Sequence, residues 1–289
     1  MFFAMATSRG KPDSNVAAIP DNMVRYRSWT YVREITQLST ARTVRGDFTP
    51  AAVPIWREVL FGIDWVALHA SPVYYGIGVP RGDGAPVIVI PGFLGSDDYL
   101  REMYYWLRRI GYTPYYSRIG RNAECPDVLT TRLLSTMDRA YSETGQPLHL
   151  IGHSLGGLVA RSAAIRRPEQ VAQVISLATP FRDIRVHPIV LAAAGFVRGR
   201  ILNRKREQKV DQACYTGSCT CDFATSIQKD VPDSVSRAAI YTETDGVIDW
   251  RSCVEEEQEL NTKVTGTHTG LAFNPQVYRR IAKLLAASR

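Results

Sequence analysis

From Pro86 onward, short apolar runs alternate with longer amphipathic ones, and this alternation constrains the fold more than any other feature of the chain. The short runs, such as residues 87–90, fit buried strands, and the amphipathic runs between them fit helices. Strands joined through helices pair in parallel, because a parallel connection needs a long crossover. We therefore expect an α/β fold with a mostly parallel central sheet flanked by helices, and one domain across residues 1–289.

The expected strands cover residues 87–90, 112–116, 148–151, 174–177 and 238–241. The expected helices cover residues 98–110, 126–144, 155–166 and 275–287. Gly111, Gly145 and Pro168 follow the first three helices and are typical residues for stopping one.

The first part of the chain departs from this rhythm. Residues 1–80 are expected to form an N-terminal extension with a helix over about 51–68, in which Ile55, Val59 and Ile63 share a face.

The second departure lies between the last two predicted strands. Residues 181–233 are too long for a plain connection and are predicted to form a cap or lid over the sheet. This segment begins with an apolar helix in which Ile189, Ala193, Val197 and Ile201 fall at fourfold spacing. The alternative is that this helix is one more crossover element.

Charge narrows the classes of partner. The net charge is +7, and much of the excess falls in residues 198–209. We interpret this segment as a solvated helix face and loop, with transient contact to anionic lipid headgroups as the alternative. Nucleic-acid binding is not expected, because the chain has no zinc-finger spacing, no aromatic RNP-like strand and no basic zipper.

The chain shows no pattern typical of membrane insertion or export. The most apolar early stretch, residues 51–70, contains Arg57, Glu58 and Asp64, so it is too polar to span a bilayer. The starting residues MFFAMA have too short an apolar region for a secretory signal. We expect a cytoplasmic protein, or a secreted one if a signal has been removed.

Cysteine spacing leaves the thiol chemistry open. The five cysteines are Cys125, Cys214, Cys219, Cys221 and Cys253. A disulfide in the cluster at 214–221, reduced thiols and a zinc site are all compatible with the spacing, which cannot give the connectivity. One hypothesis is a bridge from Cys253 to Cys219 or Cys221 that ties the cap to the segment after residue 245.

The sequence Gly152-His153-Ser154-Leu155-Gly156 matches the nucleophile-elbow pattern G-x-S-x-G. A predicted strand runs directly into it and a predicted helix runs directly out. A serine hydroxyl is a weak nucleophile, so it must lie exposed on a sharp turn within reach of a base, and glycines allow that turn. The pattern predicts Ser154 as a nucleophile, against the alternative of an ordinary glycine-rich turn.

The elbow, together with Ile-Pro-Gly-Phe-Leu-Gly at residues 90–95, resembles the lipases and carboxylesterases of the α/β-hydrolase superfamily. The resemblance covers residues 87 to 289 and implies an α/β-hydrolase fold, ester hydrolysis, and no cofactor or metal. In that superfamily a His-Gly-x motif supplies one oxyanion-hole amide, whereas this chain has Pro91 in place of the histidine. By position, the oxyanion hole is expected to use the backbone N–H groups of Phe93 and Leu155.

The remaining members of a catalytic triad follow from chain order, which in this fold is serine, acid, histidine. His268 is the histidine that follows both Ser154 and the candidate acids, and Gly266 and Gly270 flank it. For the acid we favour Asp245 over Asp249, because the superfamily places its carboxylate just past a strand and before a glycine and an apolar pair.

The expected function is a serine carboxylic-ester hydrolase that acts through an acyl-enzyme on short-to-medium acyl esters. The apolar cap helix, Phe93, Leu94 and the aromatic run at residues 104–106 favour a hydrophobic acyl pocket. The alternatives are an acyltransferase with the same triad and a non-catalytic binding protein on a hydrolase fold. The substrate is expected to be a small-molecule or lipid ester; the sequence predicts neither the natural ester nor the oligomeric state.

Overall fold

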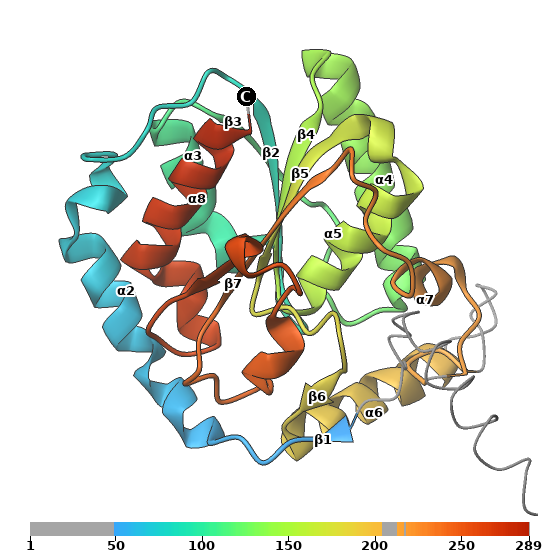
Figure 1. Ribbon diagram of the computed structural model, residues 1–289. Coiled ribbons are helices and arrows are strands. Elements are labelled where there is room, and N and C mark those ends of the chain that lie inside the picture. The colour runs from blue at the N-terminus through green and yellow to red at the C-terminus, as the bar shows by residue number, and fades with distance from the viewer. Residues whose placement is uncertain (1–48, 204–212, 217, 289) are drawn as a thin grey trace, which may run out of the picture. The chain divides into compact units, whose positions relative to one another are not determined.

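Strands predicted at five places, and a sixth short strand that was not predicted, form one parallel sheet (Figure 1). The computed structural model describes residues 49–203, 213–216 and 218–288, so most of the predicted extension and residues 204–209 of the basic segment lie outside it. The strands are β2 (Pro86–Ile90), β3 (Thr113–Tyr116), β4 (Leu148–His153), β5 (Val171–Leu177), β7 (Ser236–Tyr241) and β8 (Asn261–Lys263). Their order is β3-β2-β4-β5-β7-β8, and every neighbouring pair is parallel, so the predicted sheet is confirmed.

Strand β2 is apolar throughout and fully buried, because both faces of the sheet are covered. In β2, Val87 and Val89 point into one core, and Ile88 and Ile90 point into the other. Figure 1 shows the helices divided between these two faces. Helices α3 (Arg101–Arg109) and α8 (Pro275–Ala287) supply side chains to the first core, and α4 (Pro126–Thr144) and α5 (Leu155–Arg166) supply side chains to the second.

Helices α4, α5 and α8 have the predicted bounds, and the predicted helix at 98–110 is divided into a 3₁₀-helix, η3 (Asp97–Leu100), and α3.

Strand order places a crevice at one end of the sheet. The chain passes from β2 to β3 on one side and then returns to β4 on the other side. Connections that leave in opposite directions open a crevice at the carboxyl ends of such strands, here after Ile90 and after His153.

The helix predicted at 51–68 differs from the structure in its type and in which of its faces is buried. It consists of the 3₁₀-helix η1 (Ile55–Leu60) followed by α2 (Phe61–Ala70), and Leu68 is the buried residue of the pair. Val59 and Ile63, on the predicted apolar face, are 75% and 65% exposed. The side turned toward the protein carries acidic side chains, whose contacts are described below.

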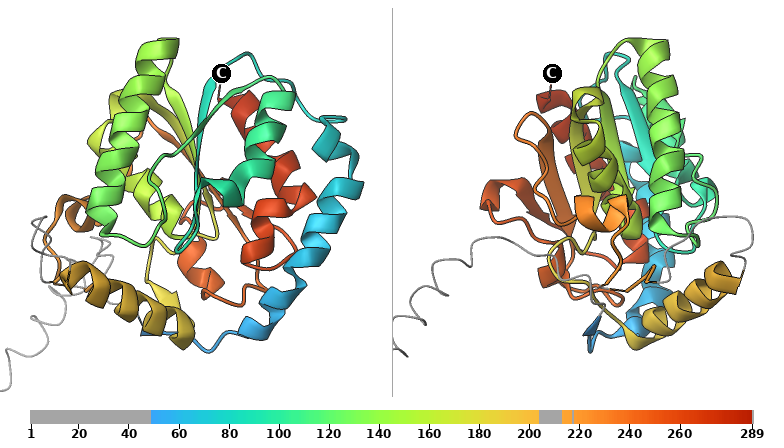
Figure 2. Two further views of the ribbon diagram at one scale, coloured as in Figure 1. Left: turned by 180° about the vertical axis from the view of Figure 1, so that it is seen from behind. Right: turned by 90° about the vertical axis from the view of Figure 1, so that its right-hand side faces the viewer.

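The predicted cap, residues 181–233 and called the cap segment below, contains β6 (Arg185–Val186), which pairs in parallel with β1 (Thr49–Pro50), and then α6 (Pro188–Asn203). Figure 2 shows α6 at one end of the sheet, off both of its faces. Val197 and Ile201 are buried as the spacing suggests, but Ile189 is 61% exposed. A short helix, α7 (Asp222–Ser226), then packs against α4 and α5. No helix among the described residues has the length and apolar character needed to cross a membrane.

All five cysteines lie in described positions and are free, so the predicted bridge from Cys253 is wrong. Cys253 is buried in the core beside the Asp245 segment. The thiol of Cys219 instead donates a hydrogen bond to the sulfur atom of Cys221, at 3.3 Å. A hydrogen bond with Cys214 lowers the pKa of the Cys125 thiol to about 7. Within the described parts of the chain, no group of three or more His, Cys, Asp or Glu side chains could hold a metal ion.

Candidate active site

Ser154 lies on a sharp turn between β4 and α5, with φ of 54° and ψ of −126°. Non-glycine residues rarely adopt a positive φ, so the surrounding structure must hold this conformation. Small neighbours make the turn possible: a Cβ atom on Gly152 would lie 2.4 Å from the Cα of Gly157, and one on Gly156 would lie 2.4 Å from the carbonyl oxygen of Pro91. The glycines of the motif therefore allow β4, α5 and the loop after β2 to meet at Ser154.

Asp245 and His268 form a buried pair near this turn. The Nδ1 atom of His268 lies 2.7 Å from Oδ2 of Asp245. The other carboxylate oxygen accepts hydrogen bonds from the backbone N–H groups of Val247 (2.8 Å) and Ile248 (2.7 Å). An ionised carboxylate makes Nδ1 the donor, which leaves Nε2 free to accept a proton.

Asp249, the other candidate acid, has different partners. Its carboxylate forms ion pairs with Arg185 (3.6 Å) and Arg251 (3.3 Å), and it accepts from the Arg251 N–H to cap the 3₁₀-helix η5 (Trp250–Cys253). The structure thus brings Asp245 to His268 and gives Asp249 a structural set of contacts.

Ser154 and His268 are both nearly buried and line the same cavity. Burial alone would lower the pKa of His268, but the charge and hydrogen bond of Asp245, with a smaller contribution from Glu58, raise it above its ordinary value. Among the hydrogen bonds of the described residues, none joins the Ser154 hydroxyl to His268. Such contacts commonly tighten when substrate binds.

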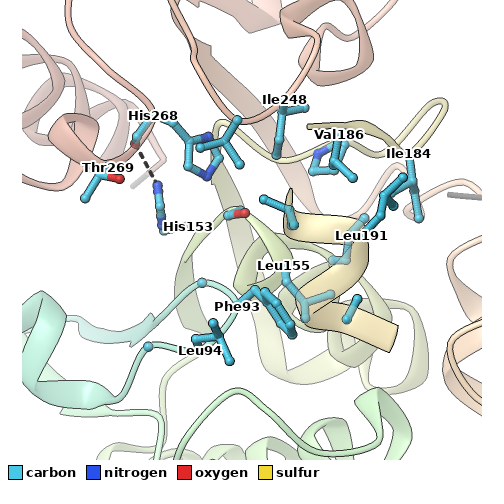
Figure 3. A pocket seen from close by; sticks show the side chains of 18 of the residues that line it. Phe93, Leu94, His153, Leu155, Ile184, Val186, Leu191, Ile248, His268 and Thr269 are labelled. Carbon is cyan, nitrogen blue, oxygen red and sulfur yellow. Dashed lines mark hydrogen bonds between the residues drawn. The ribbon is translucent and has the colours of Figure 1, made fainter. Parts of the chain in front are cut away.

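His153 directly precedes Ser154 in the chain, and its side chain contacts both the backbone and the ring of His268. Its Nε2 atom lies 3.0 Å from the carbonyl oxygen of His268, and the two rings are 4.8 Å apart (Figure 3). Burial has the largest effect on the pKa of His153 and the nearby His268 the next largest. Together they lower it to about 3, so the ring is neutral at pH 7. A neutral ring that donates from Nε2 holds the His268 backbone, a role that the sequence pattern did not indicate.

Phe93 and Leu155, whose backbone N–H groups are expected to bind an oxyanion, both line the cavity. Among the described residues, neither N–H group donates a hydrogen bond in the loops and turns. Figure 3 shows the Phe93 and Leu155 side chains among those that line the cavity. Asn122 fixes the loop that carries Phe93. Its side-chain NH₂ group donates to the carbonyl oxygen of Pro91 (2.8 Å), and its backbone carbonyl oxygen accepts from the N–H of Leu94 (2.8 Å). Asn122 therefore supports the loop in which this chain has a proline instead of a histidine.

The cavity has a volume of about 280 Å³ and is mostly apolar. Helix α6 forms part of its wall, so the cap segment and the elbow enclose it together (Figure 3). The apolar lining includes Phe93, Leu94, Leu155, Leu158, Ile184, Val186, Val190, Leu191, Ala194, Val247 and Ile248.

The aromatic run at residues 104–106 is not part of this lining, so that expectation is wrong. Trp106 is fully buried and donates to the carbonyl oxygen of Val73 (2.9 Å), and Tyr104 stacks on Tyr116 at 4.1 Å. Helix α3 lies over one face of the sheet, whereas the cavity opens at the end of the strands.

Sequence comparisons match only part of the chain. A family model described as serine aminopeptidase, S33, matches residues 130–235, which include Ser154 but neither Asp245 nor His268. A triacylglycerol lipase from Burkholderia plantarii is 29% identical over 132 residues, covering 43% of this chain and 37% of that protein. A triacylglycerol lipase from Pseudarthrobacter phenanthrenivorans is 31% identical over 106 residues, covering 34% of this chain and 33% of that protein. The chain thus spans about a third of the length of these relatives.

Two solved structures match over most of the chain. One, from work on the metagenome-derived lipolytic enzymes LipS and LipT, has a TM-score of 0.50 and 17% identity, and the match covers 72% of this chain and 96% of that one. The other, a monoglyceride lipase from Saccharomyces cerevisiae bound to a substrate analogue, has a TM-score of 0.50 and 13% identity. This match covers 73% of this chain and 90% of that one. At these identities the matches show a shared fold and carry no argument about substrate.

Proposed function

The chain has the α/β-hydrolase fold, and on this premise we propose that it is a serine carboxylic-ester hydrolase whose nucleophile is Ser154. One observation carries the proposal: the Asp245 carboxylate holds Nδ1 of His268 at 2.7 Å in the cavity that Ser154 lines. This arrangement supports Ser154 as nucleophile, His268 as base and Asp245 as the acid that orients the base, because in this fold the catalytic residues lie at the carboxyl ends of the strands.

The mechanism uses an acyl-enzyme. Nε2 of His268 removes the Ser154 proton as the hydroxyl oxygen attacks the acyl carbonyl, and the N–H groups of Phe93 and Leu155 stabilise the oxyanion. The C–O bond to the leaving alcohol then breaks, and the alcohol takes the proton from His268. Water repeats the cycle on the acyl-enzyme and releases the acid. Asp245 fixes the tautomer of His268 throughout.

The cavity favours short-to-medium acyl chains. Its volume of about 280 Å³ and its aliphatic walls suit a chain of limited length that carries no charge. The two relatives named triacylglycerol lipases support an ester as substrate, although the match covers about a third of each.

We further propose that this protein makes transient contact with a lipid surface when its ester is presented there. Helix α6 lines the cavity with Val190 and Leu191, while Ile189 and Phe196 on the same helix are 61% and 69% exposed. Leu94 connects the cavity with the surface, because it lines the cavity and is also exposed.

Phe196→Ser should lower co-sedimentation with phosphatidylcholine vesicles and leave turnover of a soluble ester unchanged. Unchanged vesicle binding would contradict this contact, as would self-association through the same face.

The test of the reaction uses p-nitrophenyl butyrate with the wild type and Ser154→Ala. The variant should lose at least about 10⁴-fold in kcat, because a triad that lacks its nucleophile retains only transition-state binding. Turnover should fall as the acyl chain is lengthened beyond the cavity, and the matching p-nitroanilides should react far more slowly. Equal rates for wild type and variant would exclude Ser154, and transfer of the acyl group to added alcohol in preference to water would indicate an acyltransferase.

A further inference from the structure

The N-terminal segment η1–α2 turns two carboxylates toward the candidate triad, and the mechanism above uses neither. Glu58 lies on η1 and Asp64 on α2, and both are half-buried. Their partners lie about two hundred residues further along the chain, in the loops that carry Asp245 and His268.

Glu58 binds both of these loops at once. Its Oε1 atom accepts from the N–H of Gly246 (3.0 Å) and from the N–H of His268 (3.0 Å). Its Oε2 atom accepts from the N–H of Thr269 (2.8 Å). One carboxylate therefore links the residue after the candidate acid to the backbone of the candidate base. Hydrogen bonds to an ionised acceptor are among the stronger ones in proteins.

Asp64 explains the glycines around His268. It accepts from the side-chain amide of Asn274 (2.9 Å) and from the N–H of Thr267 (3.4 Å). A Cβ atom on Gly270 would lie 2.0 Å from Oδ2 of Asp64, and one on Gly266 would lie 2.9 Å from Oδ1. The loop wraps closely around this carboxylate, and only glycine fits at its two ends.

We propose that Glu58 is a positioning residue for the hydrolysis proposed above: it holds the loops of Asp245 and His268 in register so that the imidazole faces Ser154. The proposal rests on that function, because a positioning role presupposes that His268 acts as the base. His268 is then held on both sides of its peptide, with its N–H bound to Glu58 and its carbonyl oxygen bound to His153.

The same carboxylate acts on the charge state of the base. Besides Asp245, the negative charge of Glu58 helps to raise the pKa of His268. The titratable groups that face this region from the packed elements are Asp64, Tyr99, His153, Asp245 and Cys253. Burial favours the neutral form of Tyr99, His153 and Cys253. The negative charges that raise the pKa of His268 are those of Asp245 and Glu58, and Asp64 is not among its causes.

The test compares Glu58→Gln with the wild type on p-nitrophenyl butyrate. We expect kcat to fall about tenfold to a hundredfold with little change in KM, because a small displacement of the base affects the transition state more than substrate binding. The acid limb of the pH–rate profile should move to lower pH, because loss of the negative charge lowers the pKa of His268, which must be neutral to act. Val59→Ala, at the next position, which is exposed, should match the wild type in kcat and in the acid limb of the pH–rate profile.

Two further measurements separate the possible failures. In Glu58→Asp the charge remains but the reach is shorter, so kcat should fall while the acid limb stays near that of the wild type. NMR titration of the His268 ring does not depend on turnover, and it should give a lower pKa in Glu58→Gln even if no ester is hydrolysed. An unchanged kcat and an unchanged His268 titration in a folded Glu58→Gln protein would overturn the proposal, whereas an inactive wild type with a shifted titration would count against the hydrolase function alone.

Discussion

The elbow around Ser154 and the N-terminal segment η1–α2 are both helical regions next to the candidate triad, but they are built in opposite ways. In the elbow, apolar strand and helix residues are buried, and the polar Ser154 is presented at the cavity. In η1–α2, Val59 and Ile63 face solvent, and Glu58 and Asp64 face the protein. Apolar packing therefore holds the first region in place, whereas hydrogen bonds to two carboxylates attach the second, together with the buried Leu68 near the end of α2.

This difference shows what hydrophobic periodicity can and cannot report. The pattern identifies a helix face, and that face is buried only when apolar contact is what attaches the helix to the domain. Where acidic side chains make the attachment, the same pattern marks the outer surface. The comparison leads to tests in which matched changes in the two regions should give different results.

The largest difference is expected for glycines. Gly156→Ala in the elbow would place a Cβ atom 2.4 Å from the carbonyl oxygen of Pro91, so backbone must move. We expect a loss of about 3 kcal/mol in the free energy of unfolding, measured by urea denaturation. A variant as stable as the wild type would mean that the elbow tolerates more volume than its geometry indicates.

The matched change in the other region should have the opposite sign. A Cβ atom on Gly62, in α2, would meet no atom within 4 Å. Alanine is a better helix former than glycine, so Gly62→Ala should raise the free energy of unfolding by about 0.5–1 kcal/mol. If thermal and urea unfolding show a loss instead, α2 is more closely packed than the structure shows.

The smallest effect is expected on the outer surface of α2. Ile63 is 65% exposed, so Ile63→Ser should change the stability by no more than about 0.5 kcal/mol and leave turnover of soluble esters unaltered. A loss of several times that size, with unchanged far-UV circular dichroism, would show that the apolar side of η1–α2 is covered in solution.

Much of the fold could be predicted from the sequence because the central sheet is buried on both sides. Its central strands contain short apolar runs, such as the whole of β2, and proline or glycine marks the ends of helices such as α4. The bounds of α4, α5 and α8 were predicted to the residue. The short edge strand β8 was not predicted, because Asn261–Lys263 is polar and pairs on one side only.

The candidate site was less accessible to sequence reasoning. Ser154 has a local motif, and the roles of Asp245 and His268, which the resemblance supplied, stay predictions even though the structure brings these two side chains together. Glu58 and Asn122 have no local signal, because each acts through backbone groups that are distant in sequence. The same limit explains the wrong bridge from Cys253, since closeness to Asp245 in sequence carries no information about distance to the cap cysteines.

The pairing of β1 with β6 bears on where the folded unit around the candidate triad begins. Thr49 and Ala51 donate backbone hydrogen bonds to residues of the cap segment, and Glu58 follows within a few residues and binds the His268 loop. The stretch 49–70 thus acts as a strap that fastens the cap to the triad loop. Cutting the chain at residue 80 would remove this strap, so a shortened protein that keeps it must begin before Thr49.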